Sequence, residues 1–146
     1  MSYTVYLSGE IHSQWREEIK QGIQVLGLDI LVLSPVTDHD ASDAAGDVLG
    51  EEADNFWRDH KSSKVNLIRT QHMIDRADLA VIRFGDKYRQ WNAAFDAGYC
   101  AALRTPYITL HSDELIHPLK EVDASAMAWA QTTDQVISLL QYILQD

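Results

Sequence analysis

One carboxylate in this chain follows a strand and a loop that could bring it to a ligand. Residues 77–85 are typical of a buried strand, and residues 91–98 of a helix that carries Asp96. In a parallel α/β sheet, ligands bind where the strands end, and a helix carboxylate projecting there can act as nucleophile or base. Asp is a poor helix former, so helix stability alone explains Asp96 badly. An exposed or ion-paired surface Asp is the alternative interpretation.

Further polar groups fall in the two loops that could meet Asp96. Asn92, Asp96 and Tyr99 share one face of the predicted helix. Tyr6 alternates with apolar neighbours in the first strand, where it either faces the site or packs in the core. Gly9 suits either a plain turn or the close approach of backbone to a ligand. The first loop also offers Glu10, His12 and Arg16, for which a solvated helix entry is the alternative. The remaining candidates are Ser8 in the first loop and Gly85 in the second.

Residues 37–43 gather carboxylates and an imidazole, which is one pattern for a metal site. The stretch lacks the glycine and terminal Glu of a calcium loop, and it has no zinc-type His or Cys pair. A polar turn or a segment covering the substrate explains it better, so we predict no metal. No phosphate loop or Gly-x-Gly-x-x-Gly motif is present, which argues against NTPases and dinucleotide oxidoreductases, and no cofactor is predicted. Cys100, the single cysteine, is expected to be a small buried residue.

The candidate residues depend on alternating strands and helices. Apolar runs predict strands over 4–7, 28–33, 79–84, 106–111 and 126–130. Helices are predicted over 13–26, capped by Ser13, over 65–76 and 89–103, and after a capping box at Thr132 and Gln135. Residues 34–64 lack periodicity, which is typical of a functional loop or of one holding a short helix. The pattern predicts one α/β domain over 1–146, a doubly wound parallel sheet of order 2-1-3-4-5 with helices on both faces.

Charge and hydropathy exclude several classes of partner. The net charge is −10, with 22 acidic against 12 basic residues. Nucleic-acid binding needs clustered Lys and Arg, so we predict no nucleic-acid partner. A single small phosphate is still compatible with the chain, because backbone N–H groups at a helix N-terminus can bind one. No stretch of about 18 apolar residues and no basic leader before the first strand is present, so we expect no membrane contact and a cytoplasmic protein.

Several motifs resemble the nucleoside 2-deoxyribosyltransferase superfamily: Tyr6-Leu-Ser-Gly9, Ala77-Asp78 opening a strand, and the run from Phe95 to Pro106. Others more closely resemble the YtoQ family within it: Val5 to Ser13, Trp15-Arg-Glu-Glu-Ile19, Arg89-Gln-Trp-Asn92 and His117-Pro-Leu-Lys-Glu121. The resemblance to the YtoQ family runs nearly end to end.

The resemblance implies a function and roles for the candidates. In the superfamily a helix carboxylate attacks the anomeric carbon of a nucleoside and the base leaves. By analogy Asp96 is nucleophile or base, Tyr6 orients it, and the Gly9 to His12 loop with Asn92 holds sugar or phosphate. Asp96 is one methylene shorter than the Glu that is usual in the superfamily. Two acidic residues that help to hold and protonate the base in the transferases are also replaced here, and their positions fall near Thr70 and Gln90.

The function implied by the resemblance is N-glycosidic bond cleavage or transfer on a nucleoside, nucleotide or related ribosyl compound. The alternative is a non-catalytic module that binds a nucleotide-like ligand in the same pocket. Relatives often complete the pocket with a second subunit, so we also expect a homodimer or higher homo-oligomer. The contact would include Trp57, Trp91 and either the helix over 89–103 or the segment 34–64. The alternative is that these aromatic side chains fill the domain's own core.

Overall fold

The computed structural model describes residues 1–145 as a five-stranded parallel sheet flanked by helices. The strands are β1 (Tyr3–Gly9), β2 (Ile30–Leu33), β3 (Leu79–Arg83), β4 (Tyr107–Leu110) and β5 (Ala128–Ala130). Their order is β2-β1-β3-β4-β5, and every neighbouring pair is parallel. The predicted fold class and strand order are confirmed.

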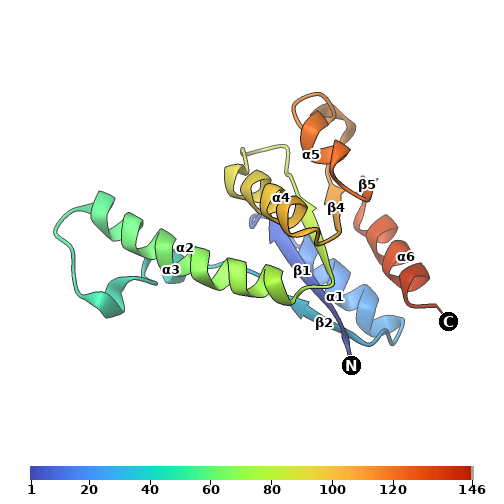
Figure 1. Ribbon diagram of the computed structural model, residues 1–146, viewed down its shortest axis with the longest axis horizontal. Helices are drawn as coiled ribbons and strands as arrows, with labels where there is room; N and C mark the ends of the chain where they lie inside the picture. The colour runs from blue at the N-terminus through green and yellow to red at the C-terminus, as the bar shows by residue number, and fades with distance from the viewer. Residues whose placement is uncertain (146) are drawn as a thin grey trace.

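Helices cover both faces of this sheet (Figure 1). The longer ones are α1 (Trp15–Val25), α3 (Asn55–Arg76), α4 (Trp91–Leu103) and α6 (Thr133–Ile143), and the short ones are α2 (His39–Asp43), α5 (Lys120–Ala124) and the 3-10 turns η1 (Asp47–Leu49) and η2 (Asp113–Leu115). The cores place α1 and α6 on one face and α3, α4 and α5 on the other. No helix within residues 1–145 is both long and apolar enough to cross a membrane.

Alternation along β1 sends its side chains to two different cores. Val5 and Leu7 are fully buried in the core beneath α1 and α6. Tyr6 belongs to the opposite core, together with residues of α3 and α4. Because successive strand residues point to opposite faces, Ser8 projects on the same side as Tyr6. The strand therefore delivers a phenol and a hydroxyl to the face that α4 covers.

Two predicted helix starts are wrong. The first helix begins at Trp15, and Ser13 does not cap it because its hydroxyl donates to Glu10 instead. The helix predicted from 65 begins ten residues earlier, at Asn55, where the side chain of Asp54 accepts a hydrogen bond from the N–H of Phe56. These extra turns have no sheet to cover, so they lack the apolar period that sequence patterns detect.

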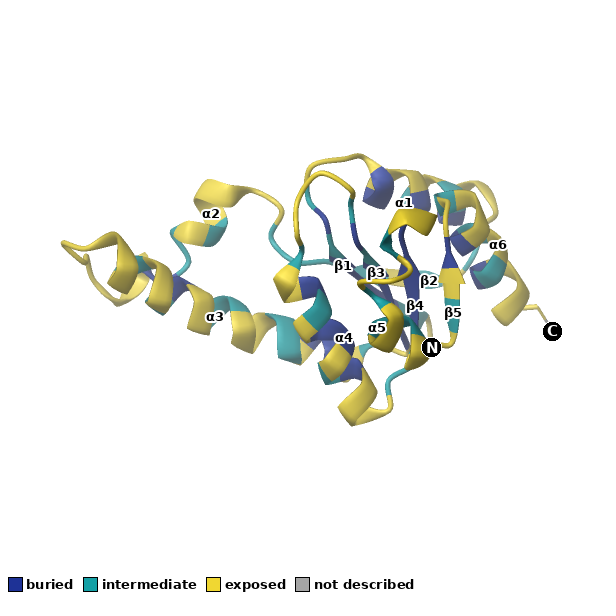
Figure 2. Ribbon diagram, turned by 90° about the horizontal axis from the view of Figure 1, so that it is seen from above, coloured by how far each residue is buried: buried dark blue, intermediate teal, exposed yellow. Residues whose placement is uncertain are grey.

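Residues 44–64, which we call the arm, project beyond the sheet and are largely exposed (Figures 1 and 2). The segment 34–64, predicted to be a functional loop or to hold a short helix, contains α2, η1 and the first turns of α3. Ser62 fixes the arm by accepting from the N–H of Gly46 at 3.1 Å and donating to the carbonyl of Asp43. The predicted capping box at Thr132 and Gln135 is confirmed, and Cys100 is buried as expected.

Gly9 is a position where an added methyl group should be costly. Its φ is +110°, and a Cβ there would overlap with the carbonyl oxygen of Arg83 on the neighbouring strand. Gly9→Ala should lower the free energy of unfolding by about 1–3 kcal/mol or more. Gly98→Ala is the matched control, because a Cβ at this helical glycine meets nothing within 4 Å. It should stabilise the protein by about 0.5–1 kcal/mol. Urea unfolding measures both, and equal stabilities would contradict the assignment.

Candidate active site

A cavity of about 830 Å³ lies where β1 and β3 end. Its walls come from β1 and its following loop, from α2, α3 and α4, and from the loop before α4. The predicted site residues that line it are Tyr6, Ser8, Gly9, Glu10, His12, Asn92 and Asp96. Gly85 does not line it. Arg16 and Tyr99 do not line it either. The structure thus brings seven of the ten candidates together at the predicted edge of the sheet.

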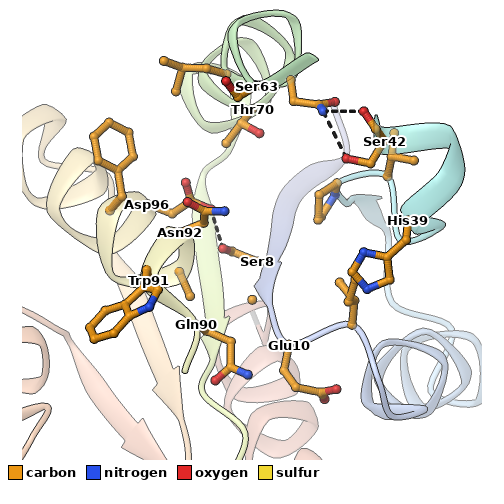
Figure 3. A pocket seen from close by; sticks show the side chains of 18 of the residues that line it. Ser8, Glu10, His39, Ser42, Ser63, Thr70, Gln90, Trp91, Asn92 and Asp96 are labelled. Atoms are coloured by element: carbon orange, nitrogen blue, oxygen red, sulfur yellow. Dashed lines mark hydrogen bonds between the residues drawn. The ribbon is translucent and has the colours of Figure 1, made fainter. Parts of the chain in front are cut away.

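Asp96 is held at the base of this cavity with one carboxylate oxygen engaged. Its side chain is buried, at 8% exposed, and Ser8 Oγ donates to Oδ2 at 2.5 Å (Figure 3). Within residues 1–145 no second hydrogen bond to this carboxylate is present, so Oδ1 is left for a ligand. Asp96 is therefore shielded from bulk water and hydrogen-bonded to the strand that leads into the Gly9 loop, so the alternative of an exposed surface Asp is wrong.

Burial raises the pKa of the Asp96 carboxyl to about 6, and the hydrogen bond from Ser8 partly offsets this by favouring the charged form. Above pH 6 the group is therefore mostly a carboxylate, in a site that holds it away from bulk water. A desolvated anion with one free oxygen is suited to attack carbon or to take a proton.

Tyr6 does not orient Asp96 in this structure, because Ser8 makes that hydrogen bond. The phenol is 1% exposed and its hydroxyl has no hydrogen-bond partner in the described part of the chain. Burial raises its pKa, and the negative charge of Asp96 raises it further. The side chain of Thr70 lies near the phenol and lowers that pKa, but the two hydroxyls do not form a hydrogen bond in this structure. Tyr6 therefore lines the cavity as a protonated, unpartnered hydroxyl.

The first loop is held from behind by the start of α1. Arg16 is buried, and its guanidinium donates to the carbonyls of Leu7, Gly9 and Glu10 at 3.2, 3.0 and 2.6 Å. The indole N–H of Trp15 donates to the carbonyl of Glu10 at 2.7 Å. Arg16 was grouped with the polar residues facing the switch point, and this is wrong: it shapes the loop and does not line the cavity.

The carboxylate of Glu10 also makes its hydrogen bonds within the loop. Its carboxylate accepts from the N–H of His12 and, at 2.5 Å, from Ser13 Oγ, and it lies 3.6 Å from Arg83 Nε. A Cβ at Gly85 would lie 2.7 Å from Glu10 Cγ, so the glycine is needed for packing against this side chain. Gly85 thus supports the site from outside the cavity.

Two loops and the helix α2 meet in an aromatic cluster on the cavity wall. The imidazole of His12 lies 4.7 Å from the ring of Tyr88 and 5.6 Å from that of His39, between ring centroids. His39 belongs to α2, which forms the wall opposite Asp96 (Figure 3). Tyr88 was not predicted as a site residue, because it carries no signal beyond its place after a strand. Residues 37–43 were interpreted only as a metal site, a covering segment or a polar turn.

The segment 37–43 uses one of its carboxylates to cap α2. Asp38 caps α2 by accepting from the N–H of Ala41 at 2.9 Å. Across residues 1–145 no three His, Cys, Asp or Glu side chains are grouped to hold a metal ion.

Tyr99 was expected on one face with Asn92 and Asp96, but its hydroxyl donates to Asp75 on α3 at 3.1 Å and it does not line the cavity. Three residues beyond Asp96, the helix has already rotated toward α3.

Two solved structures share the fold of this protein over almost the whole chain. A conserved protein from Enterococcus faecalis V583 has a TM-score of 0.62 at 14% identity, covering 99% of this chain and 100% of that one. The 2-deoxyribosyltransferase from Bacillus psychrosaccharolyticus has a TM-score of 0.55 at 19% identity, covering 94% and 95%.

A protein from Bacillus subtilis (strain 168), named as the uncharacterized protein YtoQ, is 40% identical over 146 residues and covers 99% of both chains. The family model described as Nucleoside 2-deoxyribosyltransferase YtoQ matches residues 6–144, a range that contains Tyr6, Ser8, Asn92 and Asp96. Both findings agree with the motifs around the cavity, and on this evidence the chain belongs to the YtoQ family.

Proposed function

We propose that this protein cleaves the N-glycosidic bond of a nucleoside, nucleotide or related ribosyl compound, with Asp96 as the nucleophile. The observation that carries the proposal is the buried Asp96 carboxylate, which lines the cavity and accepts a hydrogen bond from Ser8 through one of its two oxygens. The family description and the fold shared with a 2-deoxyribosyltransferase support the same class of reaction.

The proposed step is a displacement at the anomeric carbon. Asp96 Oδ1 forms a bond to C1′ while the bond from C1′ to the base nitrogen breaks, and the electron pair leaves with the base, which takes a proton from solvent. The resulting ester joins the sugar to Asp96. Water, or the nitrogen of a second base, then attacks C1′ and restores the carboxylate.

The remaining cavity residues position the substrate in this proposal. The loop from Gly9 to His12 approaches the sugar with its backbone, which Arg16 holds in place. Asn92 lies one helical turn before Asp96 and offers an amide to a sugar hydroxyl or a phosphate. The ring cluster of His12, His39 and Tyr88 suits the planar or anionic part of the ligand.

We further propose that a second copy of the chain covers the arm and the rim of the cavity. Several large apolar side chains on these segments are more than half exposed: Phe56, Trp57, Trp91 and Phe95. Trp57 and Trp91 do not fill the domain's own core, which was the alternative. Trp91 and Phe95 also line the cavity, so a symmetric contact here would close the site from outside.

Replacing the carboxylate should abolish the reaction. Asp96→Asn keeps the shape of the side chain but cannot attack C1′, so release of free base from a panel of nucleosides and nucleotides should fall by at least about 1,000-fold. Asp75→Asn, a change outside the cavity, is the control and should retain activity. Chromatography of the released base gives the readout. Ligand binding by the parent protein without any turnover would instead support a binding module.

The hydrogen bond from Ser8 should set the acid limb of the pH profile. Activity needs ionised Asp96, so kcat/KM should fall as pH drops through about 6. Ser8→Ala removes a bond that favours the charged form, so the pKa should rise and the limb should move to higher pH by about one unit. An unchanged limb in Ser8→Ala would contradict this role for the hydroxyl.

The proposed dimer makes a prediction about the arm. Light scattering should give about twice the 16.5 kDa of the chain, and Phe56→Ser with Trp57→Ser should shift the protein toward monomer. Tyr142→Ser on α6 removes an aromatic side chain that is even more exposed, and it should leave the mass unchanged. A monomer at all concentrations would refute the association, and a dimer insensitive to the arm changes would refute this interface.

A further inference from the structure

The hydroxyl of Tyr6 is a buried polar group that the proposed reaction leaves unused. Tyr6 is 1% exposed and lines the cavity, and none of the other described residues forms a hydrogen bond to its hydroxyl. The ring itself packs among apolar residues of α3 and α4, including Met73, Ile74 and Ala97. Buried hydroxyls are nearly always satisfied in folded proteins, so an unsatisfied one at a cavity wall favours a ligand group that completes it.

Tyr6 lies beside the group proposed to attack C1′. It is two residues before Ser8 on the same face of β1, and Ser8 holds the Asp96 carboxylate. The charge of Asp96 is close enough to act on the phenol. A ligand hydroxyl that reaches Tyr6 must therefore project from the sugar near C1′, on the side from which Asp96 approaches.

The stereochemistry of the sugar identifies that hydroxyl. In a β-nucleoside the base leaves from one face of the ring, and a displacing nucleophile approaches C1′ from the opposite face. In ribose the 2′-hydroxyl is on the carbon next to C1′ and projects to that opposite face. Hydrogen bonds to the 2-hydroxyl of a sugar also strengthen as a glycosidic bond breaks. A 2′-deoxyribose has no group at this position.

We propose that the substrate is a ribosyl and not a 2′-deoxyribosyl compound, and that Tyr6 selects it by a hydrogen bond to the 2′-hydroxyl. This inference rests on the proposed function, because it assumes that Asp96 faces C1′. A site built to pair with a substrate hydroxyl rejects the analogue that lacks it, since the protein group is then left buried and unpaired. The expected preference for the ribosyl compound is about 10- to 100-fold in kcat/KM.

The test compares ribonucleosides of the four RNA bases, and their 5′-monophosphates, with the matching 2′-deoxy and 3′-deoxy compounds. The parent protein should favour ribose over 2′-deoxyribose by at least about tenfold. In Tyr6→Phe the ratio should fall to about one, through loss of activity on the ribosyl compound. Tyr99→Phe is the matched control, because that hydroxyl bonds Asp75 outside the cavity, and it should keep the parent ratio.

Several results would overturn the inference: equal or better use of 2′-deoxy compounds by the parent, a penalty confined to the 3′-deoxy series, or an unchanged ratio in Tyr6→Phe. The parent comparison needs no variant, so it decides the sugar preference even if Tyr6→Phe does not fold. If no compound is cleaved, binding of the same panel to Asp96→Asn separates the two claims. A ribose preference in Kd would then support Tyr6 while the proposed cleavage fails, and an absence of binding would overturn both.

Discussion

The hydrogen bond from Ser8 to Asp96 is the interaction on which the rest of the site depends. It joins two residues 88 positions apart, one at the end of β1 and the other on α4, and it is buried. It requires β1 and β3 to be neighbours, because α4 follows β3. It also requires Ser8 to be in phase with Tyr6 and not with Leu7. The doubly wound topology and the strand alternation are thus what place a hydroxyl against a helix carboxylate.

The same region concentrates features that cost folding free energy. A desolvated carboxylate, an unpartnered phenol and a glycine with φ of +110° lie around one cavity. The structure offsets these costs beside the site and not within it. Arg16 satisfies three backbone carbonyls at the end of β1 and the start of the following loop, and apolar cores lie on both sides of β1. Such local costs, maintained by a well-packed surround, are typical of functional sites.

The strands and the position of Asp96 could be predicted from the sequence because burial leaves a strong periodic signal. The start of α3 could not, because residues 55–64 project into solvent and have no apolar face to reveal them. The predicted roles of Tyr6 and Arg16 failed for another reason: which hydroxyl reaches Asp96, and which way a guanidinium turns, depend on side-chain geometry between distant segments. Local patterns identified the residues of the site but not their partners.

Detection of a sugar bound covalently to Asp96 would test the central claim most directly. Protein mixed with a cleavable nucleoside or nucleotide and quenched in acid within the first turnover can be examined by mass spectrometry. Attack by Asp96 predicts a mass increase of one glycosyl group, mapped after digestion to the peptide that contains Asp96. Release of base with no adduct at any quench time, or an adduct on another residue, would contradict the account of Asp96 as the nucleophile.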